Sequence, residues 1–91
     1  MTNIQTGLTW EPKAFEKYQL MITKIPLFHR EIAKKIVDKC APMLAQERGS
    51  SVVEEQDIIR AFFTEVPVAF YSLMVRLFDE VKFDYKKYEK K

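Results

Sequence analysis

Apolar side chains recur at intervals of three and four residues in four consecutive stretches of this chain, and a proline or glycine separates each stretch from the next. This spacing places the apolar side chains on one face of an α-helix. The four stretches span residues 10–22, 27–48, 52–64 and 68–81. No period-two run is long enough to predict a sheet. We therefore expect an all-α fold, a compact bundle of about four helices with little or no sheet.

Prolines mark the first two helices. Thr9 is expected to cap the first helix through its hydroxyl, and Pro26 suits the first turn of the second, where amides lack intrahelical acceptors. Pro42 falls inside the second stretch and removes one helical hydrogen bond. The sequence therefore predicts either a kinked but continuous helix, the favoured alternative, or a break near Cys40.

A glycine and a possible capping box predict where the second helix ends and the third begins. Gly49 is expected to end the second helix in a left-handed conformation, because glycine adopts positive φ without steric penalty. Ser51 and Glu54 form a plausible capping box just before the next apolar residues. Between them, Val52 and Val53 are long enough for a bridge at most.

The length of the chain predicts one domain, and its charges are unevenly distributed. The 91 residues make a single helical domain, with frayed tails expected at 1–8 and 82–91, where no helical face is evident. No run approaches the roughly 18 apolar residues of a membrane span, and no signal peptide is evident, so we expect a cytoplasmic protein. Residues 1–48 carry eight basic and five acidic side chains. Residues 49–81 carry two basic and six acidic side chains, and residues 82–91 carry five basic and two acidic ones. The chain therefore has a basic first half, an acidic middle and a basic tail.

The residue types that enzymes need are scarce. His29 and Cys40 are the only histidine and cysteine, and the chain has two glycines, so neither a metal cluster nor a phosphate-binding loop is predicted. Glu54, Glu55 and Asp57 cluster at a helix start, where carboxylates complement the helix dipole. We interpret His29 as solvated or capping and Cys40 as a small core residue. No catalytic or metal-binding residue, cofactor or enzymatic activity is predicted.

Two features are candidates for binding. Trp10 either covers the core, the favoured reading, or forms the wall of a flat apolar pocket. The second helix carries a basic strip, for which a solvated face is favoured over an anion site. The strip consists of Arg30, Lys34, Lys35 and Lys39. The candidate residues for binding a ligand or partner are Trp10, Phe28, Arg30 and Lys34.

Several of these residues carry a family resemblance, over residues 10–57. The matching segments are Trp10-Glu-Pro-Lys-Ala14 and Ile25-Pro26-Leu-Phe28-His-Arg30-Glu-Ile32-Ala33, followed by Ile36, Ala41, Gly49, Val53 and Glu54. They resemble the small helical C-terminal domain of the B subunit of light-independent protochlorophyllide reductase. In that domain a tryptophan, an alanine four residues later and an Ile-Pro-x-Phe-x-Arg-x-x-Ala segment lead into a helix.

The resemblance implies a module attached to, or borrowed from, a nitrogenase-like reductase that handles a tetrapyrrole. Its role would lie in substrate enclosure or subunit contact, with Trp10, Pro26, Phe28, Arg30 and Ala33 as the shared positions. The chain lacks the large catalytic region and the cluster-ligand cysteines of such a reductase. We therefore expect a non-catalytic binding or interaction module. Its partner would be another protein or a second copy, and its ligand a tetrapyrrole.

A weaker likeness lies in the order of elements. A short helix, a long helix, a brief valine link and a short helix beginning Glu-Glu-Gln-Asp-Ile resemble the histone fold, in which two chains pair and basic loops contact DNA phosphates. This resemblance implies the alternative function, a histone-like DNA-binding dimer. The acidic segment from Glu54 to Glu80 disfavours that alternative, because DNA affinity depends on phosphate contacts.

Overall fold

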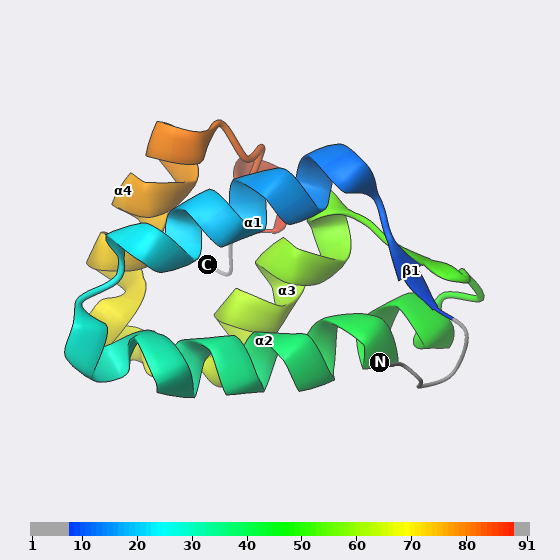
Figure 1. Ribbon diagram of the computed structural model, residues 1–91, viewed down its shortest axis with the longest axis horizontal. Helices are drawn as coiled ribbons and strands as arrows, with labels where there is room; N and C mark the ends of the chain where they lie inside the picture. The colour runs from blue at the N-terminus through cyan, green and yellow to red at the C-terminus, as the bar shows by residue number, and fades with distance from the viewer. Residues whose placement is uncertain (1–7, 89–91) are drawn as a thin grey trace.

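The computed structural model describes residues 8–88 and confirms the all-α bundle. Helix α1 lies alongside the longer α2, while α3 packs on α2 and α4 packs on α1 (Figure 1). The helices are α1 (Pro12–Lys24), α2 (Leu27–Glu47), α3 (Glu55–Glu65) and α4 (Tyr71–Val81), with short 3-10 helices η1 (Val68–Phe70) and η2 (Lys86–Tyr88). None of the helices in this part of the chain is both long and apolar enough to cross a bilayer.

The sheet consists of two short parallel strands, β1 (Thr9–Trp10) and β2 (Val52–Val53), in which Thr9 pairs with Val52 and Trp10 with Val53. This pairing corrects the predicted start of the first helix, because Thr9 and Trp10 are extended. Their neighbour Glu11 caps α1 instead, and its Oε1 accepts a 2.7 Å hydrogen bond from the amide of Ala14. The backbone amide of Glu11 also donates to the carbonyl of Val53 at 2.8 Å, so the strand pairing fixes where α1 begins.

Helix α2 runs through Pro42 without a break, so of the two alternatives the continuous helix is correct. Its end follows the prediction, since Gly49 has a φ of 80°. The amide of Ser50 donates to the carbonyl of Ala45 at 2.9 Å, and the amide of Gly49 donates to that of Gln46 at 2.9 Å. These two bonds form the Schellman arrangement that satisfies the last carbonyls of a helix.

The predicted capping box of Ser51 and Glu54 is wrong. Because Val52 and Val53 are extended in β2, α3 begins later, and Asp57 accepts a 2.8 Å hydrogen bond from the amide of Glu54. Asp57 is fully buried and is also held by Arg48, whose Nε and Nη2 lie 2.8 and 2.7 Å from its two carboxylate oxygens. This hydrogen-bonded pair raises the pKa of Arg48 and joins the end of α2 to the start of α3.

The segment after α4 also differs from the expectation of a frayed tail over residues 82–88. Lys82 adopts a left-handed conformation with a φ of 66°, which turns the chain back onto the bundle. Phe83 and Tyr85 are buried, and both rings contact Phe78, at centroid distances of 5.9 and 5.5 Å. Burial of these two rings extends the core beyond α4. Residues 1–7 and 89–91, where the rest of both tails was expected, lie outside the described residues.

Candidate binding site

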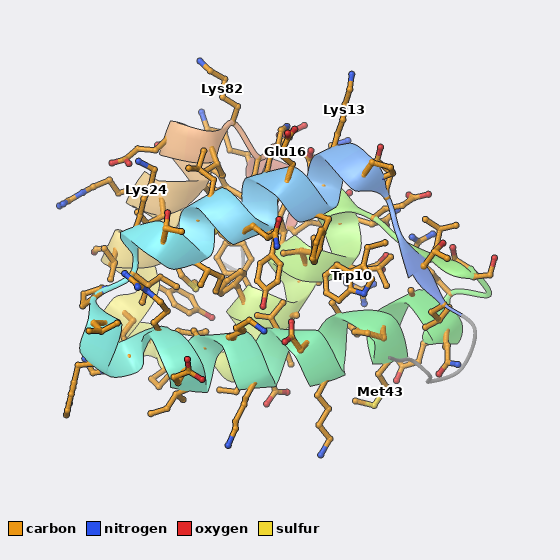
Figure 2. The ribbon with its side chains drawn as sticks, in the orientation of Figure 1. Trp10, Lys13, Glu16, Lys24, Met43 and Lys82 are labelled. Carbon is orange, nitrogen blue, oxygen red and sulfur yellow. The ribbon has the colours of Figure 1, made fainter. Side chains whose placement is uncertain are left out.

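Trp10 is the second residue of β1, and its side chain packs against the core (Figure 2). Its indole stacks on Tyr18 with the ring centroids 5.6 Å apart and the planes 16° apart, and it meets Phe15 edge-on at 5.4 Å. The phenol of Tyr18 in turn donates to Asp38 at 2.9 Å. Burial and then the negative charge of Asp38 raise the pKa of Tyr18 well above its ordinary range. Trp10 is therefore packed by aromatic neighbours of its own chain.

Arg30 closes the end of α1 rather than facing a ligand. Its Nη2 donates to the carbonyls of Thr23 and Ile25 at 2.9 and 3.1 Å, and its Nε donates to that of Ile25 at 3.3 Å. Lys34 is paired with Asp38 at 3.0 Å. Because two of the four cations in the basic strip are engaged in this way, the strip is less available to an anion than its sequence indicates.

Phe28 is the candidate residue that faces outward, with 86% of its surface exposed. It lies in the first turn of α2. The start of α2 is at the opposite end of the molecule from Trp10 (Figures 1 and 2). The structure therefore does not bring Trp10, Phe28, Arg30 and Lys34 into one site. The ring of Phe28 contacts that of His29 at a centroid distance of 5.2 Å, and His29 lines a cavity.

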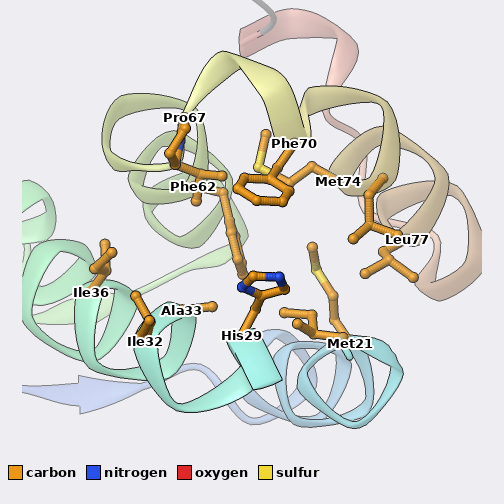
Figure 3. Close-up of a pocket in the computed structure, with 13 residues that line it drawn as sticks. Met21, His29, Ile32, Ala33, Ile36, Phe62, Pro67, Phe70, Met74 and Leu77 are labelled. Atoms are coloured by element: carbon orange, nitrogen blue, oxygen red, sulfur yellow. The ribbon is translucent and has the colours of Figure 1, made fainter. Parts of the chain in front are cut away.

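That cavity is an apolar pocket of about 240 Å³ between the start of α2 and the α3–η1–α4 segment (Figure 3). His29 is its single polar lining residue. The imidazole points into the pocket toward Phe70, with the ring centroids 5.1 Å apart. The lining residues are Met21, Ile25, His29, Ile32, Ala33, Ile36, Phe62, Val66, Pro67, Phe70, Leu73, Met74 and Leu77.

Exposed apolar side chains lie next to this pocket. Ile32 (60% exposed) and Phe70 (38%) line it, and the ring of Phe28 (86%) contacts that of the lining residue His29 at 5.2 Å. Leu27 (73%) precedes Phe28 in α2, and Val68 (76%) belongs to η1 with Phe70. We call these five residues the rim. A single exposed apolar residue needs no explanation, but several of them beside an apolar cavity are typical of a binding surface. We call the pocket and this rim together the apolar site.

Sequence reasoning missed most of this site. His29 was interpreted as solvated or capping, yet its ring is half-buried against Phe28 and Phe70, and no hydrogen bond of the ring is found among the described residues. Phe70 was expected on the apolar face of the last helix, yet it is 38% exposed and belongs to η1. The useful signal was the length of the second stretch, which exceeds that of the third by a wide margin and so leaves part of its apolar face uncovered.

The buried thiol and the possible metal ligands do not form a second candidate site in the described part of the chain. Cys40 is buried, as predicted, and its pKa is raised by burial and then by the negative charges of Glu65 and Glu47. Within residues 8–88, no three His, Cys, Asp or Glu side chains gather closely enough to hold a metal ion. The apolar site is therefore the feature from which a function can be argued.

Comparison of the chain with protein-family models, curated proteins and solved structures finds no match in any of the three. The resemblances to the reductase domain and to the histone fold stay predictions. Function must be argued from the geometry of the apolar site.

Proposed function

We propose that this protein is a non-catalytic binding domain, and that its apolar site receives an apolar group of a ligand or partner. The observation that carries the proposal is a 240 Å³ apolar pocket with the exposed side chains of Phe28, Ile32 and Phe70 at or beside it. Ligand sites in proteins are concave and mostly apolar, with a few polar groups that fix orientation. His29 would supply that polar group, since an imidazole can both donate and accept a hydrogen bond.

The dimensions of the pocket limit what enters it. A cavity of about 150 Å³ holds benzene, so this pocket has room for about one substituted or fused aromatic ring. A tetrapyrrole, the ligand that the reductase resemblance implies, would insert one edge and lay the rest of its macrocycle on Phe28 and Ile32. Such edge binding agrees with a rim that is itself apolar.

The test is a titration with a free-base porphyrin and, separately, with the dye anilinonaphthalene sulfonate, at about 1 µM protein so that self-association is negligible. Ala33→Phe fills the pocket, and Ile32→Trp narrows its mouth from an exposed position. Met43→Ser is the matched control, because Met43 is an exposed residue on the same helix that does not line the pocket.

We expect at least one probe to bind the wild type and Met43→Ser equally, and to bind both pocket variants about tenfold or more weakly. Equal binding by all four proteins would place the probe elsewhere and contradict the proposal. Failure of both probes to bind the wild type would also contradict it. Circular dichroism of each variant establishes that the helices are retained.

A histone-like DNA-binding dimer is the second candidate. Lys35 and Lys39 favour it, because both are exposed on α2 and neither forms an ion pair within residues 8–88. Binding of duplex DNA should then weaken steeply as salt is raised from about 50 to 200 mM. A chain that does not bind duplex DNA at the lower concentration excludes this candidate.

A further inference from the structure

We propose that a second copy of the chain covers the apolar site, with Phe28 of each copy inserted into the pocket of the other. This inference rests on the proposed function, since it names the occupant of the same site. The two copies would be related by a twofold axis, which brings the same patch of both chains together.

The patch carries both halves of such a contact. Phe28 is more exposed than any other large apolar residue of the described chain, and the next residue, His29, lines the pocket. The 240 Å³ pocket exceeds the cavity of about 150 Å³ that accommodates benzene, which is the size of a phenylalanine ring. Because an exposed phenylalanine ring lies beside a pocket that can hold such a ring, the surface is complementary to itself. A different protein could bind here only if it presented an apolar side chain of its own.

The exposed area is sufficient for a weak dimer. If a fully exposed residue of this size contributes about 150 Å², the low end for aromatic side chains, the five rim residues expose about 500 Å² per copy. Two copies would then bury about 1,000 Å², which is the lower limit for a specific interface. Association should therefore be reversible and concentration-dependent.

The charges beside the rim also permit a second copy to approach. Glu31 and Lys35 lie one turn apart on α2, next to Phe28 and Ile32, and neither has an ion pair within residues 8–88. Because the two charges have opposite signs, the flank of the rim presents no surface of one sign that would repel its copy. Two α2 helices that approach about a twofold axis can therefore place unlike charges opposite each other.

The first experiment measures molecular mass by sedimentation from about 10 µM to about 1 mM protein. The wild type and Met43→Ser should shift from monomer to dimer over this range. Phe28→Ser, which alters an 86% exposed side chain and so spares the fold, should weaken the dimer at least tenfold. A dimer that persists unchanged in Phe28→Ser lies elsewhere and overturns the inference.

The second experiment is a complementation test by NMR. Phe28→Ser keeps an open pocket but lacks the inserting ring, whereas Ala33→Phe keeps the ring but has a filled pocket. Isotope-labelled Phe28→Ser is mixed with unlabelled Ala33→Phe, and the methyl signals of Met74 and Leu77 inside the pocket should shift. With the labels exchanged, those signals should not move. Ile32→Trp replaces Ala33→Phe if the larger side chain at position 33 disturbs the helices.

Failure of this inference is distinguishable from failure of the proposed function. A wild type that stays monomeric to about 1 mM but binds the dye in its pocket leaves the binding domain intact and overturns the dimer. Pocket methyl signals that do not respond in the complementation mixture also overturn it. If the wild type neither associates at about 1 mM nor binds either probe, both proposals are wrong.

Discussion

Loss of Arg48 should destabilise the fold far more than loss of any exposed cation. In the folded protein Asp57 is fully buried and receives two hydrogen bonds from Arg48 and one from the amide of Glu54. Arg48→Met would leave a buried carboxylate with the amide alone. Breaking a buried pair by removing one partner costs about 3–5 kcal/mol, because the remaining charge is uncompensated.

A loss of that size is a large fraction of the total stability, which is about 5–15 kcal/mol for a domain of this kind. The corresponding fall in Tm is at least about 12 °C, from about 4 °C or more per kcal/mol for a domain under 100 residues. Urea unfolding followed by circular dichroism gives the free energy directly. Lys34→Met is the control, since its ion pair with Asp38 is exposed and contributes about 0.5 kcal/mol or less.

The double variant Arg48→Met with Asp57→Leu tests the reasoning itself. If the cost of the single change comes from an unpaired buried charge, removing that charge as well should restore part of the stability. We expect the double variant to lose about 1–2 kcal/mol, mostly from the lost cap on the amide of Glu54. A single variant within about 1 kcal/mol of the wild type, or a double variant less stable than the single one, would refute the argument.

Three further predictions concern the core. The pKa of Tyr18 is raised in the folded chain by burial and by Asp38, whereas the unfolded chain releases this proton near its ordinary pKa of about 10. Unfolding free energy should therefore fall above about pH 10, by up to about 1.4 kcal/mol per pH unit, and urea melts of Tyr18→Phe should lack this part of the slope. Native Cys40 should react with a neutral thiol reagent at least about 100-fold more slowly than in urea, and equal rates would show that the thiol is accessible. In the same melts, Phe83→Ala should lower the free energy of unfolding by about 3–5 kcal/mol, because Phe83 is buried. Phe28→Ala should change it by no more than about 0.5 kcal/mol, because Phe28 is exposed. Similar values for both variants would show that the segment after α4 is not part of the core.

The helices could be predicted from the sequence because their signals are local. The stretch 68–81 corresponds to η1 followed directly by α4, and Gly49 ends α2 with positive φ as expected. These features depend on the spacing of apolar residues and on one residue's backbone preference. Neither requires knowledge of what the segment packs against.

What the sequence did not reveal depends on contacts between distant residues. Asp57 looked like one of several carboxylates at a helix start, and only the return of α3 toward the end of α2 gives it Arg48 as a partner. Phe83 and Tyr85 follow a helix without continuing its periodicity. They are buried because Lys82 reverses the chain, and a positive φ at a lysine is not predictable from its neighbours.

The apolar site arises from unequal helix lengths. At about 1.5 Å per residue, the 21 residues of α2 extend about 31 Å and the 11 residues of α3 about 16 Å. Because a short link joins them, α3 starts at the far end of α2 and reaches back only as far as the pocket, where Phe62 and Val66 lie with Ile36. The apolar stripe of α2 continues past that point, so Phe28 and Ile32 remain uncovered. Periodicity alone does not distinguish a stripe that its own chain covers from one that needs a partner, but the difference in length between neighbouring helices does.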